Sequence, residues 1–147
     1  MRGLVGVGSL ALAGLALLGP RWRYSRWAYV AFILVGLSYF PLRAGFDFRP
    51  RACAIAFDAD AMLLSMRNWG HVVLFGWFYI VSRAQFTGPR AALWTGLATL
   101  TMGALVEIAQ GVTGAGNCRL RDLIPDTMGA LAGAAIVGGV GLLRRRA

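Results

Sequence analysis

The chain has 147 residues, enough for one domain, and 58% of them are hydrophobic while only 14% are charged. Soluble domains have about 25% charged residues, and the mean hydropathy of +0.62 also indicates an integral membrane protein. All 15 cationic residues are Arg, against 6 acidic ones. Because most of these Arg lie in short gaps between apolar runs, membrane topology and anionic lipids explain them, and nucleic-acid binding is excluded.

The apolar runs predict the helices, because a membrane-spanning helix needs about 20 largely apolar residues. Five segments fit this description: 4–19, 27–42, about 66–81, 91–110 and 125–143. The first could instead be a signal peptide, but an Arg-rich flank follows it and no small-residue cleavage motif does. The sequence therefore predicts an all-α bundle of about five transmembrane helices in a single domain, residues 1–147.

The arginines also predict the orientation of this bundle. Those between or after the expected helices fall on one side of the membrane: Arg21, Arg23, Arg26, Arg83, Arg90, Arg144, Arg145 and Arg146. The positive-inside rule places that side in the cytoplasm of a bacterial plasma membrane. The amino terminus and residues 43–67 and 111–124 are then outside. Within the first of these stretches, residues 52–57 alternate in size, as in a short strand or an interfacial segment.

Unusual polar residues gather at the expected outer ends of the last three helices. The candidates for a functional cluster are His71, Glu107, Gln110, Arg119, Arg121, Asp122 and Asp126. The members of two pairs, Glu107 with Gln110 and Asp122 with Asp126, are three or four positions apart. Each pair therefore shares a helix face.

Each candidate has a structural alternative to a functional role. Glu107 follows a stretch that must lie in the bilayer, so it either binds a ligand or pairs with Arg119 or Arg121. His71 is either satisfied by a neighbouring carbonyl or acts as an acid, base or ligand-binding group. The two Asp near residue 125 could simply complement a helix dipole. A single His makes a metal site unfavourable, and no cofactor motif is present.

Two further pairs of residues concern packing and covalent structure. Gly129 and Gly133 form a small-xxx-small pair, which predicts close approach of another helix. Cys53 and Cys118 both fall in expected outer segments, where an oxidising compartment permits a disulfide. Spacing alone does not show whether the two cysteines are near each other, so two free thiols are the alternative.

The polar motifs, taken in order, resemble the VanZ-like family of bacterial membrane proteins, named for a teicoplanin-resistance accessory protein. The resemblance covers residues 66–143 and leaves helices 4–19 and 27–42 as additions. It rests on His71 followed by Phe75, on Glu107-Ile-Ala-Gln110, and on the pattern from Asp122 to Gly133. Asp126 stands where the family usually has Asn. The resemblance implies a short helical bundle and brings no agreed biochemical activity.

These features predict a protein that engages an amphiphilic ligand at the outer leaflet. A lipid-linked cell-envelope precursor or a lipoglycopeptide would fit, and the resemblance implies a link to glycopeptide antibiotic resistance. One alternative is an enzyme acting on a lipid head group, with Glu107 or His71 as the base. Another is a structural subunit of a membrane complex. Membrane lipids are expected partners in every case.

Overall fold

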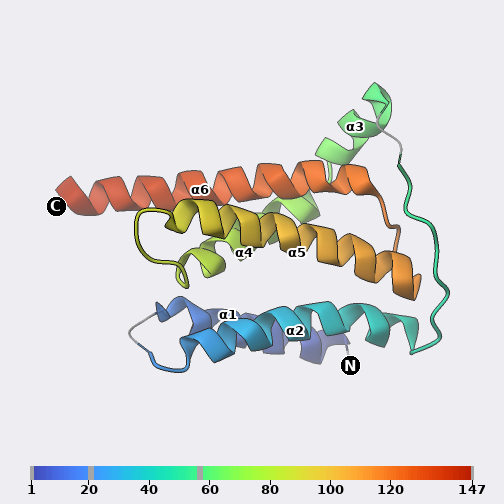
Figure 1. The fold of residues 1–147 in the computed structure, drawn as a ribbon, viewed down its shortest axis with the longest axis horizontal. Coiled ribbons are helices and arrows are strands. Elements are labelled where there is room, and N and C mark those ends of the chain that lie inside the picture. The colour runs from blue at the N-terminus through green and yellow to red at the C-terminus, as the bar shows by residue number, and fades with distance from the viewer. Residues whose placement is uncertain (1, 20–21, 56–57, 147) are drawn as a thin grey trace. The chain divides into compact units, whose positions relative to one another are not determined.

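The computed structural model describes residues 2–19, 22–55 and 58–146, which form an all-α fold (Figure 1). The helices are α1 (Arg2–Leu17), α2 (Ser25–Ala44), α3 (Ala59–Met66), α4 (Trp69–Arg83), α5 (Ala91–Thr113) and α6 (Leu123–Arg146), with the short 3₁₀ turn η2 (Leu120–Asp122) before α6. The all-α prediction is confirmed. Arg21 and Phe57, which the topology and strand arguments used, lie outside the described residues.

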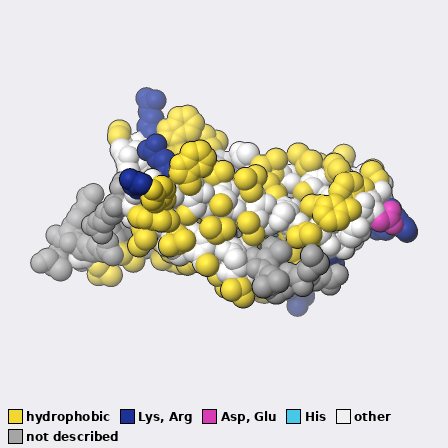
Figure 2. All heavy atoms as spheres, turned by 90° about the horizontal axis from the view of Figure 1, so that it is seen from below, with side chains coloured by type: hydrophobic (Ala, Val, Ile, Leu, Met, Phe, Trp, Pro, Cys, Tyr) yellow, Lys and Arg dark blue, Asp and Glu magenta, His cyan; other side chains and the backbone are white. Residues whose placement is uncertain are grey.

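Three helices in the described part of the chain are long and apolar enough to cross a membrane: α2, α5 and the Leu120–Leu143 stretch that includes most of α6. The expected count of five is thus met only in part. Helix α1 has a shorter apolar stretch, Gly6–Leu17, and α4 has 15 residues. At about 1.5 Å per residue α4 extends only about 22 Å, less than the ~30 Å hydrocarbon layer. Figure 2 shows a face covered mostly by hydrophobic side chains, as lipid contact requires.

The expected helix at 66–81 is interrupted at its beginning. Residues 59–66 form the separate helix α3, and α4 begins only at Trp69. Asn68 precedes α4 with a non-helical ψ of 70°, which breaks the hydrogen-bond ladder between the two helices. The Asp58 carboxylate accepts a hydrogen bond from the Ala61 N–H at 2.8 Å. It therefore caps α3.

The chain divides into two compact units. One comprises residues 1–56 and 104–120, and the other residues 57–103 and 121–147, so α5 contributes to both. In the first unit α1 packs along α2 as a hairpin. In place of the possible strand at 52–57, the described residues contain one parallel bridge, between Ala54 and Arg119. Single-bridge pairing is too short to make a sheet.

The second unit is built on the packing of α4 against α6. Phe75, Phe78 and Val81 of α4 are buried. A Cβ added at Gly129 would lie 2.4 Å from the carbonyl oxygen of Val72 in α4, and one added at Gly133 would lie 2.6 Å from that of Gly76. The helix whose approach these two glycines permit is therefore α4.

Candidate functional site

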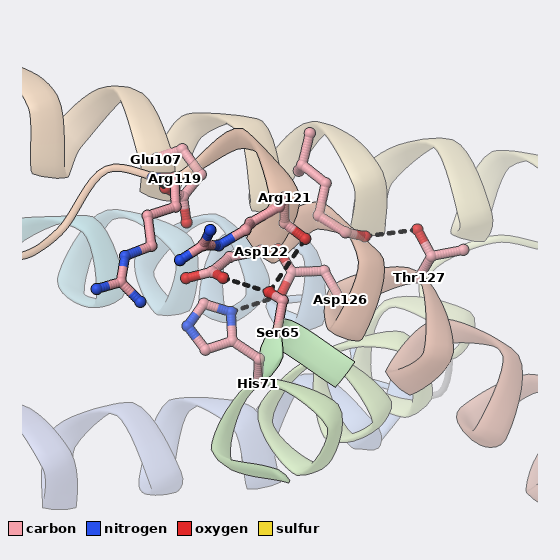
Figure 3. Close-up of polar contacts among 9 residues, drawn as sticks. Ser65, His71, Glu107, Arg119, Arg121, Asp122, Asp126 and Thr127 are labelled. Atoms are coloured by element: carbon pink, nitrogen blue, oxygen red, sulfur yellow. Dashed lines mark hydrogen bonds and ion pairs between the residues drawn. The ribbon is translucent and has the colours of Figure 1, made fainter. Parts of the chain in front are cut away.

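His71 and Asp126 are the central pair of the polar cluster in the second unit. Nδ1 of His71, in the first turns of α4, lies 2.6 Å from Oδ1 of Asp126, in the first turn of α6. Figure 3 shows the two side chains directed toward each other. The Asp126 side chain is fully buried, whereas that of His71 is 20% exposed. When this carboxyl group is ionised it only accepts hydrogen bonds, and the ring then carries its hydrogen on Nδ1.

Other groups fix the immediate surroundings of this pair. The His71 ring stacks on Phe75 one turn later, with ring centroids 6.0 Å apart. Oδ2 of Asp126 is buried and accepts no hydrogen bond from the described residues. A Cβ added at Gly103 of α5 would lie 2.7 Å from that oxygen. Because Gly103 has no side chain, the Asp126 carboxylate has room beside α5.

Asp122 has a partner that the sequence does not predict. The hydroxyl of Ser65, near the end of α3, donates a hydrogen bond to Oδ1 of Asp122 at 2.5 Å. The same hydroxyl is 3.3 Å from the carbonyl oxygen of Arg121 (Figure 3). Ser65 and Asp122 are both buried, so this hydrogen bond ties α3 to the start of α6. A lone Ser in an apolar segment offers no sequence signal for such a role.

Glu107, Gln110 and Arg119 belong to the first unit. Oε2 of the buried Glu107 accepts a hydrogen bond from the backbone N–H of Arg119 at 2.6 Å. The hydrogen bond from residue 119 is therefore made by its backbone amide, not by the guanidinium group that the sequence suggested. The backbone amide is already held in place by the chain, whereas a guanidinium group could bind only if the long Arg side chain were ordered at a cost in entropy. The amide is therefore the favoured donor. The Gln110 side chain lies against Gly116, where an added Cβ would be 3.0 Å from its Cδ.

A disulfide joins Cys53 to Cys118, with the two Cα atoms 4.6 Å apart. Of the two alternatives for these cysteines, the structure has the bonded one. The Ala54 N–H donates to the Cys118 carbonyl at 2.9 Å, and the Leu120 N–H donates to the Ala54 carbonyl at 3.2 Å. Gly111 lies beside the bridge, since a Cβ there would be 3.2 Å from the Cys53 Sγ. The disulfide thus holds the segment after α2 to the segment that carries the amide bonded to Glu107.

The seven candidates therefore divide between the two units: Glu107, Gln110 and Arg119 lie in the first, and His71, Arg121, Asp122 and Asp126 lie in the second. Among the described residues, no three His, Cys, Asp or Glu side chains are grouped so that they could hold a metal ion. The chemistry available in the second unit is that of a partly exposed imidazole oriented by a buried carboxylate. In the first unit it is that of a buried carboxylate beside a disulfide.

The sequence model of the VanZ/LLP1 family matches residues 22–142. The chain belongs to the VanZ/LLP1 family. The match covers most of the chain. It begins at residue 22, whereas the motif resemblance begins at residue 66, so the match also includes the expected helix at 27–42. No curated protein and no solved structure matches this VanZ/LLP1 chain significantly.

Proposed function

We propose that this VanZ/LLP1 protein binds the polar head of an amphiphilic ligand through His71, at the outer leaflet of the bacterial plasma membrane. The observation that supports this most directly is the pairing of a partly exposed His71 with the fully buried Asp126. A buried carboxylate holds the ring in one orientation, and an oriented ring can hydrogen-bond a ligand without losing much entropy.

The helices near the pair, α3 and α4, expose apolar side chains, which favours a ligand with an apolar part. Trp69 and Val73, also on α4, are 67% and 70% exposed, and because each is two positions from His71 they lie on a face of the helix turned away from it. Leu63 and Leu64 on α3 are also exposed. A polar pair on a helix whose other face exposes apolar side chains fits a molecule with a polar head and an acyl chain. A lipid-linked envelope precursor or a lipoglycopeptide has this character, and the family's link to glycopeptide resistance agrees with it.

The proposal includes a five-span topology, with α1 and α4 completing the three longer spans. Arg83 and Arg90, at and after the end of α4, are then cytoplasmic. His71 lies at the opposite end of α4, which puts it at the outer surface. Short helices such as α1 and α4 can span a bilayer that thins locally around them.

Binding of teicoplanin to the full chain in phosphatidylcholine nanodiscs tests the proposal. We expect His71→Gln to weaken binding about tenfold, because a good polar contact contributes about 1.4 kcal/mol. Arg90→Gln, at the expected cytoplasmic side, is the control and should leave affinity unchanged. Deacylated teicoplanin should bind more weakly than the intact molecule. Equal affinities of the wild type and His71→Gln for every probe would contradict the proposal.

A second candidate, an enzyme acting on a lipid head group, is favoured by the same pair. A His oriented by a buried carboxylate is an arrangement that serves general base catalysis. Incubation of the protein with envelope lipids, followed by mass spectrometry, should then reveal a released head group. The product should disappear with His71→Gln and persist with Arg90→Gln. Absence of any product with the wild type would remove this candidate and leave the binding proposal standing.

A further inference from the structure

A pocket with three arginines lies in the first unit. Its volume is about 350 Å³, and it is lined by the end of α2, the segment that follows, and the turn after α5. Arg43, Arg49 and Arg51 contribute the basic side chains, and Asp47 the acidic one. The sequence places these residues in a long outer segment and indicates no role for them.

Backbone contacts and the disulfide hold the walls of this pocket in place. The N–H of Arg49 donates to the Thr113 carbonyl at 3.4 Å, and that of Arg51 donates to the Gly111 carbonyl at 2.8 Å. Gly114, in the turn, has a φ of +65°. A Cβ there would lie 2.4 Å from the Arg49 carbonyl oxygen. The turn can therefore approach the arginine segment only because residue 114 is Gly.

The guanidinium groups of the pocket do not cap the carboxyl ends of α2 and α5. Arginines near helix carboxyl ends often neutralise unpaired carbonyls. Here backbone N–H groups do so: those of Gly45 and Phe46 donate to carbonyls in the last turn of α2, and the N–H of Gly114 donates to the Gln110 carbonyl in α5. The positive charge of the pocket is therefore available to a ligand.

The charges in the pocket do not cancel. Arg49 forms an ion pair with Asp47, with Nη2 and Oδ2 2.7 Å apart. Arg43 and Arg51 form no hydrogen bond or ion pair through their side chains with any residue that the structure describes. Two uncompensated guanidinium groups beside a third favour a ligand with more than one negative charge. The planar fork of Arg matches the oxygens of a phosphate group in particular.

The position of the pocket favours a lipid as the source of that phosphate. Both α2 and α5 are candidate spans, and both end at the pocket, so it lies at the level where a bilayer meets water. Phe46 and Phe48, on either side of Asp47 in the sequence, are 68% and 48% exposed. Exposed Phe rings at that level can insert at the boundary between head groups and acyl chains, and basic side chains close to a membrane surface attract anionic lipid head groups.

We propose that this pocket binds the phosphate of an anionic lipid, with Arg43 and Arg51 binding its oxygens and Arg49, paired with Asp47, forming part of the wall. The inference goes beyond the proposed function and does not depend on it, since no residue of the His71–Asp126 pair takes part. Loss of one binding activity without the other would therefore distinguish the two sites.

Native mass spectrometry of the full chain in a neutral detergent tests this site. Phosphatidic acid, which exposes a phosphomonoester, is titrated against phosphatidylcholine, and soluble pyrophosphate is titrated separately. We expect phosphatidic acid to bind at least about tenfold more tightly than phosphatidylcholine. The double variant Arg43→Gln/Arg51→Gln should lose that preference. Arg67→Gln/Arg90→Gln removes the same net charge elsewhere and should retain it.

Several outcomes would overturn the proposal. Equal losses in the two double variants would show that net charge, not the pocket, attracts the lipid. Binding of pyrophosphate but not of phosphatidic acid would exclude a lipid as the source. An intact disulfide and an unchanged thermal unfolding midpoint establish that the pocket variant is folded. If it is not, Arg43→Lys/Arg51→Lys keeps the charge without the planar fork, and an undiminished preference in that variant would contradict the role of the fork.

Discussion

Oδ1 of Asp126 and Nδ1 of His71, 2.6 Å apart, form a polar link between α6 and α4. The carboxylate is fully buried, and a buried charge is costly unless it is paired. This single contact therefore both stabilises the helix pair and orients the imidazole.

Replacing Asp126 with Ala should destabilise the protein more than replacing it with Asn. Asn keeps an oxygen that can accept the His71 N–H, whereas Ala leaves the ring without this partner. We expect a loss of about 1–3 kcal/mol for Asp126→Ala and a smaller loss for Asp126→Asn. Thermal unfolding in nanodiscs measures both. Equal midpoints for the two variants would show that the hydrogen bond does not stabilise the fold.

Because α4 packs against only part of α6, substitution of different glycines of α6 should affect stability differently. Gly129→Ala would bring a Cβ to 2.4 Å from a backbone carbonyl of α4, and overpacking of this kind costs about 1–3 kcal/mol. Gly138 lies in the same helix, and a Cβ there would meet nothing within 4 Å. Gly138→Ala should therefore be neutral or slightly stabilising. Similar unfolding midpoints for the two variants would contradict the close approach of these helices.

The disulfide should form in protein taken from an oxidising compartment. Peptide mapping without reduction is expected to recover the Cys53 and Cys118 peptides joined, and mapping after reduction to separate them. The bridge spans 65 residues of sequence. Its removal by Cys53→Ser/Cys118→Ser should cost about 2–4 kcal/mol. Recovery of only free thiols from such a compartment would refute the bridge.

Glu107 should matter for folding because of its contact with the Arg119 amide. Glu107→Ala removes the acceptor of that N–H, so a loss of about 1–3 kcal/mol is expected. Glu107→Gln retains an oxygen and should lose less. Asp60→Ala, at an exposed position, is the control and should have little effect. An effect of Glu107→Ala no larger than that of Asp60→Ala would count against the contact.

The proposed topology is testable with reporter fusions. Fusions after Arg26 and Arg90 should report the cytoplasm, and a fusion near Asp58 should report the exterior, because short Arg-rich loops remain inside. An exterior signal after Arg26 would reject the five-span topology and, with it, the outer position of His71.

The sequence by itself determined the helical membrane class and the positions of the long helices. The apolar runs at 27–42, 91–110 and 125–143 became α2, α5 and α6 with shifts of only a few residues at most ends. Hydrophobicity and helical hydrogen bonding are local properties, so a short stretch of sequence is sufficient to reveal them. The same local patterns selected His71, Asp122 and Asp126, because isolated polar residues at the ends of apolar runs need partners.

Only the tertiary structure decided which partners those residues have. His71 and Asp126 are 55 positions apart, and Ser65 is 57 positions from the Asp122 that it contacts. Arg43 and Arg51 became part of a pocket only because their segment runs along the end of α5. These pairings depend on how closely helices approach, which glycines such as Gly129 permit through backbone contacts. The Gly129–Gly133 pattern indicates that some helix approaches closely, but which helix it is depends on segments remote in sequence, and no local pattern of residues encodes that choice.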